Sequence, residues 1–218
     1  MTFTWTDLAN YGPGFLNAAG IVFGITLCAI MVSWAAGLSV ALGNRSDLAW
    51  VRGLSGLYVW FIRGTPTLIQ IFLIYFGLPQ FGVRISPFTA GFIALGLNSG
   101  AYVAEIIRAG LSAIPKGQME SALALGFSRR ETMQRIILPQ VCRIIVPPIT
   151  NEAITTLKNT SLLSTITVVE LTLYAQTIIA RTYRPFEFYI SAAIVYLALT
   201  TILSRFAAWV EKRYATLS

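Results

Sequence analysis

Long apolar runs alternate with short charged segments along this chain, and the length of each run is informative. A membrane-spanning helix needs about 20 mostly apolar residues. Five runs reach that length, at residues 15–42, 54–78, 87–111, 136–157 and 188–210. We therefore predict an all-α integral membrane protein with five transmembrane helices, built as a single domain over residues 1–218.

The connection from Lys158 to Glu187 is long and mixed in polarity. Its apolar part, residues 168–179, is too short to span a bilayer. Backbone polar groups cannot be left exposed to lipid, so we predict a partly re-entrant or interfacial hairpin that packs against protein on the outer side. The opening stretch has no basic segment of the signal-peptide kind, so we expect the first run to remain as an anchor.

Charge supports the membrane assignment and gives it a direction. The chain is 56% hydrophobic and 11% charged, with a mean hydropathy of +0.68, whereas soluble domains carry about 25% charged residues. If the N-terminus is outside, ten cations lie inside and four outside, and the cytoplasmic side of a membrane protein carries the excess. We therefore predict a bacterial inner-membrane protein with a periplasmic N-terminus and a cytoplasmic C-terminus. The inner cations are Arg45, Arg52, Arg108, Lys116, Arg129, Arg130, Arg135, Arg205, Lys212 and Arg213, and the outer ones are Arg84, Lys158, Arg181 and Arg184.

Several classes of function are disfavoured by composition. The chain has no histidine, which removes the commonest general base and metal ligand, and we predict no metal site. Cys28 and Cys142 lie far apart in apolar runs, and we expect both to be small buried hydrophobes. The net charge is +7, but no stretch has the interleaved basic and aromatic residues that are typical of nucleic-acid binding. No lysine lies in a phosphate-binding G-x-x-x-x-G-K-[ST] loop, so any ATPase must be another chain.

The cytoplasmic loop, about residues 112–135, has a patterned sequence. KGQMESALAL is rich in helix formers, and Gly126 permits a tight backbone turn. Ser128 and Glu131 then have the spacing of a capping box that starts a second helix. The alternative, a plain solvated connector, would need no such spacing. We predict helix, sharp turn and helix outside the membrane, with an apolar docking face formed by Ala122, Leu123 and Leu125.

This loop resembles the EAA loop of permease subunits in bacterial ABC importers. The matching residues are Glu120, Ala122, Gly126, Ile136, Leu138 and Pro139, with Ser121 in place of the first alanine. Three further stretches are similar to the polar amino acid branch of that family: RGTPTLIQIFLIYFGLP, AYVAEIIRAGLSAIPKGQ and NEAITTLKNTSL. The resemblance covers about residues 15–214.

The resemblance implies a type I importer permease fold and a set of partners. The permease is not an enzyme and holds no cofactor, because two cytoplasmic ATPase subunits bind ATP and Mg. Glu120, Ala122 and Gly126 couple the permease to them. A second permease subunit completes the pathway, with a homodimer slightly favoured over a heterodimer, and a periplasmic binding protein delivers a polar amino acid. Membrane lipid surrounds the assembly.

Polar residues within the fourth run are the first candidates for substrate binding. Glu152, Thr155, Thr156 and Asn159 fall at i, i+3, i+4 and i+7, on one helical face. The alternative for the threonines is hydrogen bonding between helices. The resemblance places an amino acid pocket here, carried by Glu152 and Asn159. Many relatives have aspartate at the position of Asn159, so we expect a neutral or acidic polar substrate. Gln70 and Asn98, in the second and third runs, are further pocket candidates.

The break in the second run is the candidate gate. Gly64 and Pro66 interrupt a helical ladder wherever they occur, and Arg63 is a costly charge within a membrane segment. We predict a pathway or gating role for Arg63, Gly64, Thr65 and Pro66. An ATP-independent channel or secondary transporter would also explain the polar residues within the membrane, but it leaves the loop pattern unexplained. A membrane-bound enzyme lacks a plausible catalytic constellation.

Overall fold

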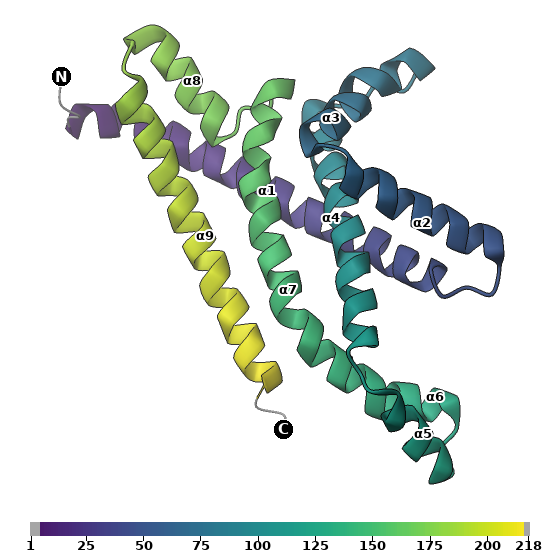
Figure 1. Ribbon diagram of the computed structural model, residues 1–218. Coiled ribbons are helices and arrows are strands. Elements are labelled where there is room, and N and C mark those ends of the chain that lie inside the picture. The colour runs from purple at the N-terminus through teal and green to yellow at the C-terminus, as the bar shows by residue number, and fades with distance from the viewer. Residues whose placement is uncertain (1–4, 216–218) are drawn as a thin grey trace.

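The computed structural model describes residues 5–215, and this part of the chain contains helices and no strand (Figure 1). The π and 3-10 turns η1 to η4 continue or join the α-helices. The α-helices are α1 (Trp5–Gly43), α2 (Ala49–Gly64), α3 (Thr67–Phe72), α4 (Pro87–Ser112), α5 (Lys116–Ala124), α6 (Arg129–Thr132), α7 (Leu138–Asn159), α8 (Leu171–Thr182) and α9 (Pro185–Ala215). The turns are η1 (Leu73–Gly77), η2 (Leu78–Phe81), η3 (Met133–Ile137) and η4 (Thr160–Ile166).

Three of these helices, α1, α4 and α9, are long and apolar enough to cross a membrane. Two bent helix pairs raise the number to five if each pair is one span, as the sequence predicted. The second predicted run is broken at the Gly64 and Pro66 positions, as the sequence predicted. The segments Ala49–Gly64 and Thr67–Phe81 meet at 112°, because the chain leaves the helical ladder between Gly64 and Pro66.

The most extensive contact between spans joins α1 to α4, and it depends on glycines. A Cβ on Gly96 would lie 2.9 Å from the carbonyl oxygen of Ala29, and one on Gly100 would lie 2.9 Å from the Cβ of Ala36. Small residues let two membrane helices approach so that van der Waals packing can hold them together. Because α4 is largely buried, α1 and α4 form the centre against which α2 and α7 pack.

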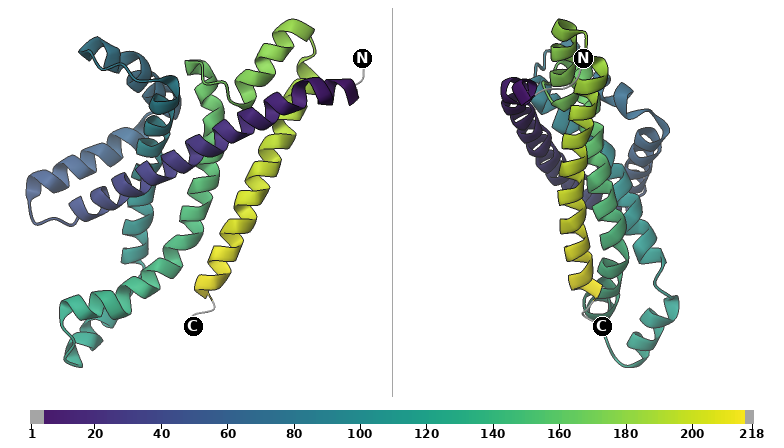
Figure 2. Two further views of the ribbon diagram at one scale, coloured as in Figure 1. Left: turned by 180° about the vertical axis from the view of Figure 1, so that it is seen from behind. Right: turned by 90° about the vertical axis from the view of Figure 1, so that its left-hand side faces the viewer.

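At the end of the bundle that holds the start of α1, α8 packs against protein, as predicted for this segment. Its buried residues Leu171, Ala175 and Ile178 form one cluster with residues of α1 and α9. Glu170, fully buried, caps α8 by accepting hydrogen bonds from the backbone N–H groups of Thr172 at 2.8 Å and Leu173 at 3.0 Å. Figure 2 shows α8 beside the start of α1 from behind.

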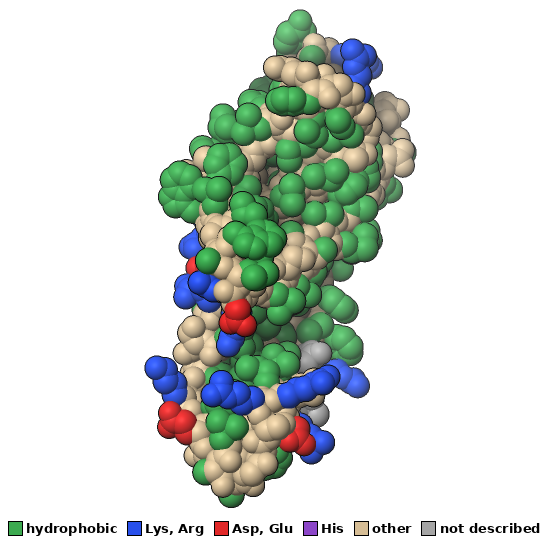
Figure 3. All heavy atoms as spheres, turned by 90° about the vertical axis from the view of Figure 1, so that its right-hand side faces the viewer, with side chains coloured by type: hydrophobic (Ala, Val, Ile, Leu, Met, Phe, Trp, Pro, Cys, Tyr) green, Lys and Arg blue, Asp and Glu red, His purple; other side chains and the backbone are tan. Residues whose placement is uncertain are grey.

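The two ends of the molecule differ in charge and in structure. The start of α1 and α8 lie at one end, and α5, α6 and the end of α9 lie at the other (Figures 1 and 2). Figure 3 shows basic side chains gathered in the lower half of one face, around the end that carries α5 and α6, with a broad hydrophobic band above them. The cysteines depart from expectation, because Cys28 and Cys142 are only half-buried.

Candidate functional site

The break between α2 and α3 is held by one buried amide. Thr65 is extended, and Pro66 leads into α3, so the helical hydrogen bonds stop at this point. The Nε2 of Gln70 donates to the carbonyl oxygens of Ile62 at 2.8 Å and Thr65 at 3.1 Å. The Nδ2 of Asn98, on α4, donates to the Oε1 of Gln70 at 2.9 Å. The two amides therefore satisfy freed backbone groups and join the break to α4.

This arrangement changes the interpretation of Gln70 and Asn98. We predicted that both line a substrate pocket, but their side chains are 4% and 5% exposed and point at each other and at the break. In the single chain they stabilise the bent backbone instead of facing an open site. A sequence alone cannot distinguish an amide that lines a pocket from one that stabilises a bent backbone, because both are polar residues within an apolar run.

Beside the break, Arg63 takes part in a three-charge cluster. Its Nη1 lies 3.0 Å from the Oε2 of Glu105 on α4, and its guanidinium lies over the ring of Tyr102. Arg108 donates to both carboxylate oxygens of Glu105, through Nε at 2.9 Å and Nη2 at 3.0 Å. Glu105 was not among the predicted site residues, although an acidic residue within a predicted span is itself a signal of function.

The polar stripe of α7 lies at the edge of the buried surface. Glu152 and Asn159 are half-buried, Thr155 is exposed, and Thr156 is 2% exposed. Thr156 donates to the carbonyl oxygen of Glu152 and Thr155 to that of Asn151, each at 3.0 Å. Both threonines therefore bond within their own helix, and Thr156 is not open to a substrate as predicted.

Glu152 is in contact with α4 and, through it, with α1. Its carboxylate lies beside the hydroxyl of Ser99 on α4. The hydroxyl of Ser33 on α1 donates to the Ser99 oxygen at 3.0 Å, and both serines are buried. The carboxylate thus faces the junction of the three central helices, where a charged group needs a polar partner.

The loop between α4 and α7 has the predicted local geometry. Gly126 has a φ of +89°, so the turn after α5 uses backbone that L-residues rarely adopt. The hydroxyl of Ser128 accepts from the N–H of Glu131 at 3.2 Å, and the Glu131 carboxylate accepts from the N–H of Ser128 at 3.0 Å. The helix–turn–helix and its capping box are confirmed.

The predicted docking face of this loop needs one correction. Ala122 is 3% exposed, so in the single chain it does not lie on an open docking surface. Leu123 and Leu125 are 37% and 78% exposed and form the apolar surface that remains. Glu120 is also exposed, on the same short helix.

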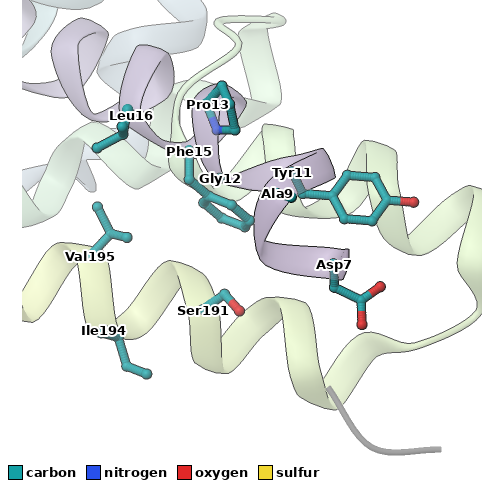
Figure 4. Close-up of a pocket in the computed structure, with 10 residues that line it drawn as sticks. All are labelled: Asp7, Ala9, Tyr11, Gly12, Pro13, Phe15, Leu16, Ser191, Ile194 and Val195. Atoms are coloured by element: carbon teal, nitrogen blue, oxygen red, sulfur yellow. The ribbon is translucent and has the colours of Figure 1, made fainter. Parts of the chain in front are cut away.

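One apolar groove lies away from all predicted site residues. It has a volume of about 580 Å³ and runs between the start of α1 and α9 (Figure 4). Its walls are mostly apolar, and Asp7 at its edge is ion-paired with Arg184 at 3.2 Å. Leu16 and Ile194, which line it, are 73% and 60% exposed, as expected of a face turned towards lipid. Within residues 5–215 no group of three or more potential metal ligands occurs.

Comparisons with known proteins agree with one another. The family described as "Binding-protein-dependent transport system inner membrane component" matches residues 29–216. The chain is 39% identical to the probable amino-acid ABC transporter permease protein YckA of Bacillus subtilis, covering 93% of this chain and 90% of that protein. It is 37% identical to the glutamine transport system permease protein GlnP of Escherichia coli K12, covering 98% of each. A crystal structure of an amino acid ABC transporter with histidines has a TM-score of 0.91 and 39% identity, covering 98% of this chain and 100% of that one.

Proposed function

This chain belongs to the family of binding-protein-dependent transport system inner membrane components, and we propose that the polar face of α7 recognises the amino acid it carries. The chain is the permease subunit of an amino acid ABC importer, with a type I importer fold, and it is a transport subunit rather than an enzyme. It is a multi-pass protein of the inner membrane. The channel alternative does not explain membership of this family.

The observation that carries the proposal is the exposed polar face of α7. Asn151, Thr155 and Lys158, at i, i+4 and i+7, are all exposed in the single chain, beside half-buried Glu152 and Asn159. Polar groups at membrane depth do not face lipid, so this surface faces water or another protein chain. A polar amino acid moving through the membrane needs such a surface along its path.

Glu152 supplies the charge for recognition. Every amino acid carries an α-ammonium group, and a half-buried carboxylate is a strong partner for it. Asn159 lies two turns further along α7 and can bond to a side-chain amide or carboxylate, but it brings no second negative charge. This composition favours a neutral or acidic polar amino acid over a strongly cationic one. Glutamine, for which GlnP is named, is an amino acid of this class.

The permease is one subunit of a larger importer. A permease of this family works with an ATPase and a binding protein. We infer two ATPase subunits that bind ATP and Mg and receive the loop around Gly126, a second permease chain against the exposed face of α7, and a periplasmic protein at the α8 end. We favour a homodimer, in which the exposed polar face of α7 would meet the same face of a second copy. The N-terminus is then periplasmic and the C-terminus cytoplasmic.

The break at residues 63–66 is the proposed gate. Its geometry is fixed by Gln70 and Asn98, while Arg63 connects it to Glu105 through an ion pair that remains partly exposed. An exposed ion pair gains little free energy and can be exchanged during a conformational change. Gly64 and Pro66 keep this segment outside the helical ladder, so it can move without unfolding a helix.

Competition uptake in vesicles that contain the whole complex tests the recognition proposal. Glu152→Gln should nearly abolish uptake, because loss of one member of a desolvated charge pair costs about 2–5 kcal/mol. Asn159→Asp should move the preference from glutamine and glutamate towards lysine. Asp47→Asn, an exposed carboxylate in the α1–α2 connection, is the matched control and should behave as wild type. Unchanged uptake and ranking in both site variants would remove α7 from the recognition site.

A further inference from the structure

A cavity with several polar lining residues lies between the ends of α1 and α4, apart from the α7 face. It has a volume of about 430 Å³ and is lined by Ala41, Asn44, Arg45, Arg108, Leu111 and Ser112. Two guanidinium groups, an amide and a hydroxyl converge on it, and this described lining includes no carboxylate. Arginine forks match the geometry of phosphate oxygens, so the donor set favours a phosphate group.

The local charge balance leaves room for one anion. Glu105 accepts from Arg108 at 2.9 and 3.0 Å, but these bonds use two of the five N–H donors of that guanidinium. Asp47 follows Arg45 closely in the sequence, and Arg52 donates to the backbone carbonyl oxygen of Asp47 at 3.1 Å. Arg45, Arg52, Arg63 and Arg108 against Asp47 and Glu105 give a net charge of +2. A phosphodiester carries one negative charge and would neutralise part of this excess.

The surroundings of the cavity indicate where the phosphate comes from. Leu42, Leu48 and Trp50, next to it in the chain, are 71%, 55% and 66% exposed. Tryptophan is enriched at the level of lipid headgroups, and exposed leucines beside it suit acyl chains. A free phosphate ion would gain nothing from these apolar neighbours, whereas a phospholipid would use both parts of the surface.

We propose that this cavity binds the headgroup of an anionic phospholipid. The phosphodiester lies between Arg45 and Arg108, with Asn44 and Ser112 as further donors, and the acyl chains lie along the exposed leucines. Basic pockets between membrane helices are suited to such headgroups. The bound lipid would link the end of α1 to α4, the helix that also carries Glu105 of the gate. The site does not depend on which amino acid is carried.

Native mass spectrometry of the purified complex tests the proposal, with phosphatidylglycerol and phosphatidylethanolamine added at equal concentration. Wild type should retain phosphatidylglycerol preferentially. Arg45→Gln should bind it roughly fivefold more weakly, since a basic residue near a membrane surface contributes about 1 kcal/mol. Arg45→Lys should keep most of the preference. Arg181→Gln, which removes the same charge at the α8 end, is the matched control and should bind as wild type.

Each outcome decides the question. Loss of preference in Arg45→Gln alone supports the site, provided that the variant elutes as an intact complex. Equal retention in wild type and Arg45→Gln overturns it, as does equal loss in Arg45→Gln and Arg181→Gln, which would show only a general attraction of charge. Displacement of phosphatidylglycerol by inorganic phosphate would overturn the lipid assignment, because the apolar part of the surface would then contribute nothing.

Discussion

Arg63 and Glu105 lie 42 residues apart in the chain, yet the Nη1 of one is 3.0 Å from the Oε2 of the other. The arginine lies in the last turn of α2, next to the 112° bend, and the glutamate lies on the central helix α4. Arg108 donates to both oxygens of the same carboxylate. The bend therefore has two attachments to α4: the buried pair of amides, Gln70 and Asn98, and this partly exposed ion pair.

We expect Arg63→Gln and Glu105→Gln each to lower uptake several-fold without unfolding the protein. The side chains are 45% and 22% exposed, so the pair contributes at most about 1 kcal/mol to stability. A double-mutant cycle on uptake should show coupling, with the double variant hardly worse than either single one. Arg52→Gln serves as the control for charge. Additive losses would show that the two residues act separately.

A side chain at Gly126 should disturb coupling to the ATPase. Its φ is +89°, a conformation that costs an L-residue about 1–2 kcal/mol and a β-branched residue more. Gly126→Val should therefore reduce ATP-driven uptake, while the binding protein still recognises substrate. Gly117→Val is the matched control, since Gly117 lies in α5 and a Cβ there meets no atom within 4 Å. Wild-type uptake by Gly126→Val would show that the loop is a connector only.

The capping box should weaken in acid. Hydrogen bonds from the hydroxyl and the N–H of Ser128 lower the pKa of the Glu131 carboxyl below its ordinary value. Because the folded-state pKa is the lower one, this stabilisation is present above the ordinary pKa and is lost as pH falls through the folded value. Hydrogen-exchange protection of the α6 amides should hold from pH ~7 down to the ordinary glutamate pKa of ~4.3 and decline as the pH falls below it. Glu131→Gln should show no such decline, and an equal decline in both proteins would contradict the assignment.

Topology can be measured with single cysteines at exposed positions near the two ends. Tyr183 is 87% exposed beside α8, and Leu125 is 78% exposed after α5. In a variant without Cys28 and Cys142, we expect Tyr183→Cys to react with a membrane-impermeant maleimide in intact cells. Leu125→Cys should react only after permeabilisation, because the cytoplasmic side carries the excess of cations. The reverse pattern would invert the predicted orientation.

The sequence by itself determined the features that depend on local chemistry. Run lengths predicted the spans, because a bilayer sets the length of apolar helix needed to cross it. The Ser128–Glu131 capping box and the turn at Gly126 followed from residues a few positions apart, since capping and positive φ are local. The loop motif also identified the family, which the comparisons confirmed.

Tertiary structure decided which polar residues face which partner. Gln70 and Asn98 have the composition of pocket residues, but helix packing turns them onto the bend, and Ala122 and Thr156 are buried by their own chain. The pairing of Arg63 with Glu105, and the meeting of Arg45 with Arg108, join segments about 40 and 60 residues apart. Helical periodicity gives the face on which a residue lies, whereas the neighbour of that face depends on how the helices cross, and the glycines of α4 set that crossing against α1.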